Sequence, residues 1–350
     1  MELSQAQKTA LKALSVGVKQ GKRQQILGGY AGTGKTTIAK NFVEEWPKFA
    51  VCAYTGKAAN VLRKKGLPAS TIHSLIYEPV VVNNVVTFEL RSELPNNGIL
   101  IDEGSMVSED IYSDLCSFGL PMVYFGDHGQ LEPIGSDFNL MKKPDYRLEE
   151  IYRFAGDIAK FSEHLRKGFA ARGFKPTTGE VKLLSRASLT DDRLVAADQV
   201  ICAYNKTRVE MNARIRAILG YTGLVNVGER VMCLRNNKQL GLFNGMQGIV
   251  RRLYMKRRKH YMDFEFDGMV IPEIWYDTHQ FGTEKADFDF GKDEPNPFDY
   301  AYCVTAHKSQ GDEWDNVLAI EQKCSKWDHR RWAYTVASRA RIGLEWVLAI

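Results

Sequence analysis

The chain has 350 residues, of which 44% are hydrophobic and 25% are charged, and its formal net charge is +5. This composition is typical of a globular protein with two or three domains and excludes a disordered or fibrous chain. The sequence contains no apolar run long enough to cross a bilayer and no signal peptide, so we expect a cytoplasmic protein with no membrane partner. Its six scattered cysteines predict neither a disulfide framework nor a zinc site.

The first element in chain order is a helix that Ser4 can cap and that continues to about Lys19. After it, short apolar strands alternate with helices up to about residue 150. This alternation predicts an α/β fold with a mostly parallel sheet, helices on both faces, and ligands at the carboxyl ends of the strands. The predicted strands cover residues 24–28, 49–54, 98–102 and 121–126.

The loop over residues 29–36 reads Gly-Tyr-Ala-Gly-Thr-Gly-Lys-Thr and lies between a predicted strand and an amphipathic helix. Its glycines let backbone N–H groups turn inward around phosphates, and the helix N-terminus adds the positive end of its dipole. Lys35 would approach the β and γ phosphates, and Thr36 would bind Mg²⁺. We therefore predict an ATP site; the alternative is an ordinary glycine-rich turn. The expected nucleotide ligands are Gly29, Gly32, Thr33, Gly34, Lys35, Thr36 and Thr37.

Two further strands end in polar side chains at the same edge of the predicted sheet. Asp102 would hold Mg²⁺ mainly through its water shell, and Glu103 would orient and deprotonate an attacking water. Gln130 follows the neighbouring strand and would hydrogen-bond the γ phosphate. This set predicts ATP hydrolysis rather than phosphoryl transfer to an alcohol. The alternative for Asp102 and Glu103 is a solvated turn after a strand.

Two later segments depart from the alternating pattern. Near Asn83 and Asn84, two β-branched runs flank a two-residue turn, which predicts a hairpin within residues 77–97. From about residue 225 to 299, short strands at close spacing predict a small barrel.

Beyond the glycine-rich loop, nine segments in this order resemble the motifs of superfamily 1 DNA helicases. Within that superfamily the chain is similar to the RecD-like and Dda-like group, superfamily 1B, which moves 5′ to 3′. The resemblance covers nearly the whole chain. The nine segments are residues 54–62, 70–75, 102–106, 126–131, 148–153, 205–207, 243–245, 304–311 and 334–341.

The resemblance implies an α/β fold with two RecA-like P-loop motor domains, each built on a parallel sheet. Residues 1–150 would form motor domain 1A, with a hairpin insertion, 1B, at about residues 77–97. Residues 151–224 and 300–350 would form motor domain 2A, and residues 225–299 would form 2B, a small SH3-like β-barrel inserted in the second motor domain. We expect no accessory domain after the last apolar strand.

The resemblance also implies residues at the ATP site beyond the loop. Gln7 would read the adenine edge, or it is a surface glutamine of the first helix. Arg153 and Arg339 would be arginine fingers that reach the γ phosphate from domain 2A, and the alternative for each is a surface salt bridge. Gly311 would belong to the nucleotide-binding set.

A path for single-stranded DNA across both motor domains is implied as well. Phe88 on the hairpin would stack on the last base pair as the pin that splits the duplex, or it packs against its own domain. The basic cluster of the barrel, Arg251, Arg252 and residues 256–260, would contact DNA backbone, or it is a solvated turn. The expected strand ligands are Thr55, Lys57, His73, Asn205, Thr305, His307 and Ser309.

The sequence therefore predicts an ATP- and Mg²⁺-dependent 5′ to 3′ DNA helicase that acts as a monomer on single strands and duplex junctions. A bacterial or phage-infected cell is the expected setting, with replication, repair or recombination proteins as partners. Two alternatives stay open: an RNA helicase of the same superfamily, and an ATP-switched protein that clamps single strands without moving.

Overall fold

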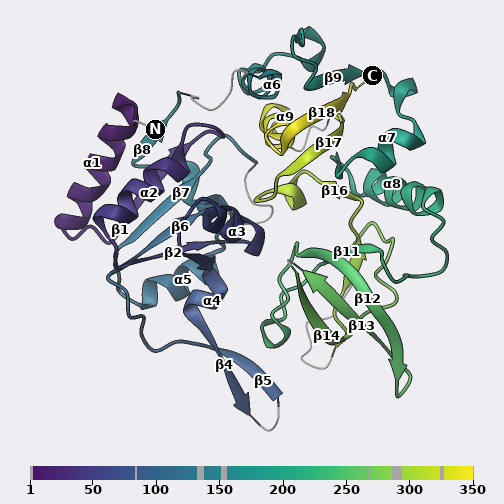
Figure 1. The fold of residues 1–350 in the computed structure, drawn as a ribbon, viewed down its shortest axis with the longest axis horizontal. Helices are drawn as coiled ribbons and strands as arrows, with labels where there is room; N and C mark the ends of the chain where they lie inside the picture. The colour runs from purple at the N-terminus through teal and green to yellow at the C-terminus, as the bar shows by residue number, and fades with distance from the viewer. Residues whose placement is uncertain are drawn as a thin grey trace.

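A computed structural model describes residues 3–82, 85–131, 138–150, 156–266, 268–285, 294–323 and 327–349. Figure 1 shows three bodies: a parallel sheet with helices in the first half of the chain, a second such sheet in the other half, and a smaller antiparallel sheet below the second one. A two-stranded hairpin extends from the first body. Within the described ranges, no helix has the length and apolarity of a bilayer span.

The first sheet has the strand order β3-β2-β6-β7-β1-β8, and all its pairs are parallel. The four predicted strands are confirmed, whereas two strands of only three residues each were missed because they are too short to show a periodicity. The strands are β1 (Gln24–Gly29), β2 (Phe49–Ala53), β3 (Ala69–Thr71), β6 (Gly98–Asp102), β7 (Met122–Gly126) and β8 (Tyr146–Leu148).

Two hydrophobic cores cover the two faces of this sheet. Val51 and Leu100 belong to one core, whereas their chain neighbours Cys52 and Ile101 belong to the other. This division follows from the period of two residues along a strand, so every residue of these runs must be apolar. The surrounding helices are α1 (Gln5–Lys19), α2 (Lys35–Glu45), α3 (Gly56–Lys64), α4 (Ile72–Ile76) and α5 (Glu109–Ser117).

The second sheet is also parallel, with the order β16-β10-β17-β18-β9. Its core contains the fully buried rings of Phe161, Trp332 and Trp346. The strands are β9 (Val181–Leu184), β10 (Gln199–Cys202), β16 (Cys303–Thr305), β17 (Trp314–Ile320) and β18 (Ala340–Val347). The helices are α6 (Asp157–Arg166), α7 (Asp191–Ala196), α8 (Asn205–Ile218) and α9 (His329–Ala337).

The predicted hairpin is confirmed as a structure. β4 (Tyr77–Val82) pairs antiparallel with β5 (Val85–Leu90), from Tyr77 opposite Leu90 to Val82 opposite Val85. The two turn residues, Asn83 and Asn84, lie outside the described residues.

The smaller sheet is antiparallel, with the order β14-β13-β12-β11-β15. An isolated bridge between Tyr276 and Asn296 joins the chain beyond β14 to the chain ahead of β15, so the two edges approach each other at one end. An SH3-like barrel stays a prediction. The strands are β11 (Arg230–Cys233), β12 (Gln247–Lys256), β13 (Lys259–Phe266), β14 (Met269–Trp275) and β15 (Phe298–Tyr300). Short 3-10 helices cover Gly104–Met106 (η1), Leu140–Lys142 (η2), Ala171–Gly173 (η3), Arg186–Ser188 (η4), Lys238–Leu240 (η5) and His307–Ser309 (η6).

Candidate active site

The loop over residues 29–36 leaves β1 and enters α2 as a tight turn. Gly32 and Gly34 have φ angles of 82° and 84°, a region that glycine adopts without a steric cost. A Cβ atom on Gly34 would lie 2.3 Å from Nε2 of Gln7, so this close approach also requires glycine. Nζ of Lys35 donates to the carbonyls of the first two loop residues at 2.6 and 3.1 Å. The loop has the form of a phosphate cradle whose lysine folds over it.

Gln7 is buried behind this loop rather than exposed on α1, so the surface alternative is wrong. Its Nε2 donates to the carbonyl of Thr33 at 2.9 Å, and its Oε1 accepts from the backbone N–H of Ser4 at 3.0 Å. Ser4 in turn caps α1, which completes a capping box. The amide therefore ties the first helix to the phosphate loop, and contact with an adenine edge stays a prediction.

Asp102 and Glu103 lie at the carboxyl end of β6, and burial and nearby charges shift the pKa of both carboxyl groups. Burial raises the pKa of Asp102, and the nearby Lys35 ammonium opposes that rise. Burial and the Asp102 carboxylate raise the pKa of Glu103 to about 7, against the lowering effects of Arg339 and Lys35. The two carboxylates thus lie between a cation of the first motor domain and a cation of the second.

The backbone of Glu103 is in the left-handed region, with φ 56° and ψ 40°. A non-glycine residue in this region costs conformational energy, and such residues cluster at functional sites. The conformation turns the chain sharply from β6 into the η1 turn at Gly104. It lets two consecutive carboxylates follow one strand end.

The residues present fit a magnesium-bound triphosphate. Thr36 and Thr37 lie in the first turn of α2, are half-buried, and follow the loop directly. The Asp102 carboxylate lies near Lys35, as its effect on the pKa requires. Hydroxyl and carboxylate oxygens are the ligands that Mg²⁺ takes in such sites, together with water and phosphate oxygens. When bound, the ion would neutralise charge on the phosphates.

Arg339 follows α9 of the second motor domain and has an exposed fraction of only 3%. Its guanidinium donates three hydrogen bonds of 3.0 Å each, two to main-chain carbonyls and one to the hydroxyl of Ser338. These bonds hold the guanidinium, whose charge lowers the pKa of Glu103 as the charge of Lys35 does. Arg153, the other predicted finger, lies outside the described residues.

The segment of residues 127–131 follows β7 and lies against α9. Gln130 is buried, and its Nε2 donates to the Asp127 carboxylate at 3.3 Å. The backbone N–H of Leu131 donates to Oγ1 of Thr335 at 2.9 Å, and Nη1 of Arg331 donates to the Gln130 carbonyl at 3.2 Å. Gln130 therefore lies at the junction of the two motor domains. Its contact with a γ phosphate stays a prediction.

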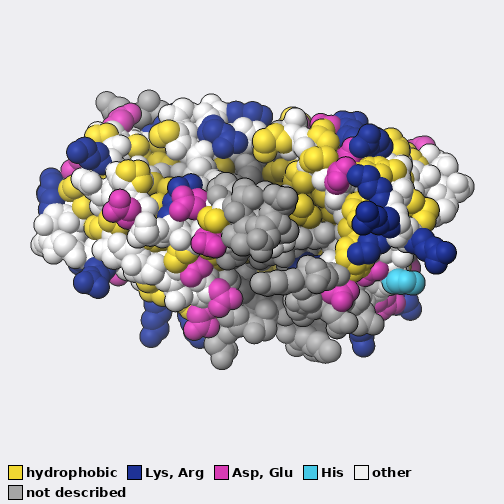
Figure 2. Space-filling model, turned by 90° about the horizontal axis from the view of Figure 1, so that it is seen from below, with side chains coloured by type: hydrophobic (Ala, Val, Ile, Leu, Met, Phe, Trp, Pro, Cys, Tyr) yellow, Lys and Arg dark blue, Asp and Glu magenta, His cyan; other side chains and the backbone are white. Residues whose placement is uncertain are grey.

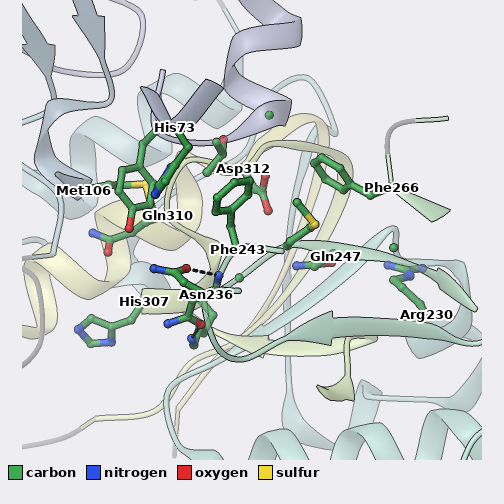
Figure 3. Close-up of a pocket in the computed structure, with 18 of the residues that line it drawn as sticks. His73, Met106, Arg230, Asn236, Phe243, Gln247, Phe266, His307, Gln310 and Asp312 are labelled. Atoms are coloured by element: carbon green, nitrogen blue, oxygen red, sulfur yellow. Dashed lines mark hydrogen bonds between the residues drawn. The ribbon is translucent and has the colours of Figure 1, made fainter. Parts of the chain in front are cut away.

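A cavity of about 730 Å³ lies between both motor domains and the antiparallel sheet (Figure 3). Its lining residues come from all three bodies, as expected for a channel that crosses the molecule. They include Thr55, Gly56, His73 and Met106 of the first motor domain, Phe243, Asn244, Gln247 and Phe266 of the smaller domain, and His307, Lys308, Gln310 and Asp312 of the second motor domain.

Two phenylalanines of the smaller domain reach the first motor domain across this cavity. The Phe243 ring lies 4.4 Å from the His73 ring, with an angle of 36° between the planes (Figure 3). A Cβ atom on Gly56 would lie 2.9 Å from the Phe266 ring. Aromatic faces in a channel of this kind stack on the bases of single-stranded nucleic acids.

One lysine of the cavity keeps a positive charge although its side chain is half-buried. Burial lowers the pKa of Lys308 to about 8, so the ammonium is still mostly protonated at pH 7. Its Nζ donates to Oδ1 of Asn244. Burial also lowers the pKa of His307, which favours the neutral imidazole. Lys308 therefore carries a charge at neutral pH, whereas His307 is favoured in its neutral form.

The structure brings only some of the predicted strand ligands together. Thr55, His73 and His307 line the cavity, whereas Thr305 at the end of β16 and the exposed Asn205 at the start of α8 lie outside its lining. The side chain of Lys57 lies outside the described part of the chain. Gly311 lies at the domain seam, because a Cβ atom there would be 2.7 Å from Sδ of Met106.

One predicted strand contact, that of Ser309, needs correction, and a second, that of Phe88, is affected by packing. Ser309 is fully buried, and its hydroxyl donates to the Ala306 carbonyl at 2.7 Å, so it closes the η6 turn instead of facing a ligand. Phe88 stands opposite Pro79 in the hairpin and packs against the core of the first motor domain. This packing agrees with the alternative for Phe88, whose side chain is half-buried, and contact with a base pair stays a prediction.

Lys and Arg side chains gather over the smaller domain on the face shown in Figure 2. Arg257 and Arg258 form the turn between β12 and β13, with φ angles of 48° and 62°. Lys256 pairs with a glutamate of β14, and Nζ of Lys259 lies 3.4 Å from the centroid of the Trp275 ring. These contacts pair part of the positive charge of the cluster. A contact with DNA backbone and a solvated turn both stay predictions for it.

Sequence reasoning did not assign a role to several residues of the cleft and the channel. Phe243 and Lys308 lie within recognised segments, so their chemistry could have been proposed from their positions. Phe266 ends a strand of the smaller domain that carries no motif, and the sequence holds no signal for its contact with Gly56.

Two family models match the chain. Residues 2–184 match the family model described as an AAA domain. Residues 300–345 match the model described as a UvrD-like helicase C-terminal domain. The first match covers more than half of the chain and contains the phosphate loop and both carboxylates.

Among curated proteins, the chain is 26% identical to the ATP-dependent RecD2 DNA helicase of Deinococcus radiodurans over 379 residues, which cover 97% of this chain and 48% of that protein. It is 31% identical to the ATP-dependent DNA helicase Dda of Enterobacteria phage T4 over 252 residues, which cover 61% of this chain and 57% of that protein. The chain thus spans about half the length of these relatives.

Solved structures support the fold. A Bacteroides Pif1 structure bound to single-stranded DNA matches 99% of this chain and 92% of its own with a TM-score of 0.55 and 20% identity. A Pif1 helicase structure from Candida albicans matches with a TM-score of 0.54 and 21% identity, over 99% of this chain and 94% of its own. These structures share the fold of the chain. The chain belongs to the family described as an AAA domain, and its RecD2 and Dda relatives support a RecD/Dda-like helicase of superfamily 1B.

Proposed function

We propose that this protein is an ATP- and Mg²⁺-dependent DNA helicase that moves 5′ to 3′ along a single strand and separates duplex DNA. The observation that carries the proposal is the composition of the cleft. Lys35 and Glu103 lie on one motor domain, and Arg339 of the other acts on the same carboxylate. RecD2 and Dda are named ATP-dependent DNA helicases, which supports this activity.

Each residue of the cleft has its own proposed role in hydrolysis. Lys35 and the loop N–H groups hold the phosphates. Glu103, with a pKa near 7, orients the attacking water and takes its proton. Arg339 offsets the charge that develops on the γ phosphate as the bond breaks. Because the two cations belong to different motor domains, ATP draws the domains together and hydrolysis releases them.

The cavity between the three bodies is the proposed path of the strand. Its mixed lining, with aromatic rings, amides and one buried lysine, suits a strand whose bases stack and whose backbone is held loosely. The β4–β5 hairpin is the proposed pin, and β5 contacts η5 of the smaller domain, which would steady it. One chain holds both sides of the ATP cleft, so we propose that a monomer is active.

A strand-displacement assay tests the proposal. With ATP and Mg²⁺, the protein should separate a DNA duplex that carries a 5′ single-stranded tail and should leave a matched duplex with a 3′ tail intact. Displacement of only the 3′-tailed duplex would refute the direction. Tight single-strand binding without displacement of either substrate would support the ATP-switched clamp instead. A matched RNA duplex in the same assay tests the RNA helicase alternative.

We expect Phe243→Ala to weaken binding of single-stranded DNA, because the ring is a stacking surface in the channel beside His73. Loss of one base–aromatic stack costs about 1–3 kcal/mol, which corresponds to a dissociation constant raised about 5- to 150-fold. Fluorescence anisotropy with a labelled oligothymidine measures the change.

The matched control is Phe169→Ala, a phenylalanine on the second motor domain with an exposed fraction of 59% that does not line the channel. Its affinity for the oligonucleotide should equal that of the wild type. Equal affinity of both variants would show that the strand does not pass Phe243.

A further inference from the structure

The hydroxyl of Tyr334 joins three elements of the cleft. Tyr334 lies on α9 of the second motor domain and is buried. Its Oη accepts a hydrogen bond of 2.8 Å from the backbone N–H of Ala31, within the phosphate loop. The same hydroxyl donates a hydrogen bond of 2.7 Å to Oδ2 of Asp127, at the start of the 127–131 segment.

The direction of both bonds is fixed by chemistry. A backbone N–H can only donate, so the Tyr334 oxygen is the acceptor for Ala31, and its single proton is left for the Asp127 carboxylate. Burial and the neighbouring carboxylate raise the pKa of Tyr334 well above its usual value, which keeps that proton in place. The hydroxyl therefore links the loop to the carboxylate, and a phenylalanine at this position could form neither hydrogen bond.

The surrounding rings leave little freedom for this hydroxyl. The centroid of the Tyr30 ring lies 6.0 Å from that of the Tyr334 ring, edge-on to it, and 4.4 Å from that of the His128 ring, tilted by 40°. On Tyr30 the guanidinium carbon of Arg166, from the second motor domain, lies 4.0 Å from the ring centroid. A Cβ atom on Gly129 would be 2.7 Å from the Tyr30 ring and 3.2 Å from the Tyr334 ring, so a larger residue there would separate them.

The helix that carries Tyr334 is bonded to the 127–131 segment at further points. Thr335 accepts from the backbone of that segment, and Arg331 donates to it. Arg339 lies just beyond the end of the same helix. A shift of Tyr334 would therefore move Gln130 and Arg339 as one unit, because both are tied to α9.

We infer that Tyr334 is a positioning residue that couples the state of the phosphate loop to the 127–131 segment and to the closure of the two motor domains. The inference rests on the proposed function. The Ala31 N–H is a donor of the loop that surrounds the phosphates, so a loop that reshapes around a nucleotide must carry the hydroxyl with it or release it. In either case the change reaches Asp127 and α9, and through them the two domains that hold the strand.

The test compares Tyr334→Phe with the wild type in a linkage measurement on the full chain. The dissociation constant of a labelled oligothymidine is measured with and without a non-hydrolysable ATP analogue, and the ratio of the two constants is the coupling factor. Allosteric coupling is typically about 5- to 150-fold, and we expect Tyr334→Phe to bring this factor close to 1. Each ligand alone should bind with an affinity close to that of the wild type, since the two hydrogen bonds that the variant removes are made to protein groups and not to either ligand.

The control is Tyr112→Phe, which removes a hydroxyl whose 2.6 Å bond to Oε1 of Gln24 lies within the first motor domain. Its coupling factor should equal that of the wild type. A lower melting temperature for Tyr334→Phe with an unchanged coupling factor would show a structural role alone and would overturn the inference. Failure of the wild type to bind either ligand would overturn the proposed function and this inference with it.

A second variant keeps the test independent of one substitution. Asp127→Ala removes the acceptor of the Tyr334 hydrogen bond, so it should also lower the coupling factor. In the double variant the two effects should not add, because both break the same hydrogen bond. Additive losses would mean that the two residues act separately, which contradicts the inference.

Discussion

Replacing Lys35 with alanine should lower the rate of ATP hydrolysis by about 100- to 1000-fold, the range for loss of a single electrostatic stabiliser. In the structure the Lys35 ammonium bonds to two loop carbonyls and acts on Asp102 and Glu103, so it is the cation nearest the expected phosphates. The channel for the strand lies elsewhere, since Lys35 is not among its lining residues. Single-strand binding should therefore be retained. Phosphate release and oligonucleotide anisotropy measure the two properties.

Lys40→Ala is the matched control, because Lys40 lies on the same helix and extends toward Gly66 at the end of α3, away from the loop. It should hydrolyse ATP at the wild-type rate. Unaltered turnover in Lys35→Ala would refute the assignment of the loop. Loss of single-strand binding together with hydrolysis would show that the variant has lost more than the phosphate contact.

Replacing Arg339 with alanine should lower the maximal rate of DNA-stimulated hydrolysis by about 10³- to 10⁵-fold, as expected for an arginine finger. The guanidinium is buried, is held by three hydrogen bonds, and acts on Glu103 from the second motor domain. Affinity for a fluorescent ATP analogue should change little, since the loop and Lys35 remain. Arg339→Lys should also be impaired, because an ammonium cannot reproduce the planar fork of donors.

Arg341 provides the control, as it lies two residues further along the chain and pairs with Asp315 at 2.6 Å on the surface. Its side chain has an exposed fraction of 50%, so Arg341→Ala should leave hydrolysis unchanged. A wild-type maximal rate in Arg339→Ala would remove the second motor domain from the chemistry. Only residues of the first motor domain would then take part in hydrolysis.

The parts of the fold with a strong local signal could be predicted from the sequence. The glycine-rich loop needs left-handed glycines and a following helix, and both requirements are visible in the residues themselves. The buried strands of the first sheet are apolar throughout because both faces are covered. The cap at Ser4 and the β4–β5 hairpin likewise depend on neighbours in the chain.

Residues whose role depends on distant contacts were predicted less well. Phe88 and Ser309 fit the expected pattern by type and position, yet packing against the first core and a local bond to Ala306 use them otherwise. β3 and β8 form only because longer parallel strands offer them an edge. Local propensity holds no information on such pairings.

The sequence by itself determined a phosphate-binding loop, two carboxylates at a strand end, and the order of elements for two α/β domains, because these features depend on backbone conformation and on neighbours within a few residues. Only the tertiary structure decided that Tyr334 bonds to the loop across 303 residues of chain, that Phe243 meets His73, and that Arg339 acts on Glu103. Contacts of this kind form where two domains pack against each other. The geometry of that interface depends on the packed domains and not on residues that are neighbours in the chain.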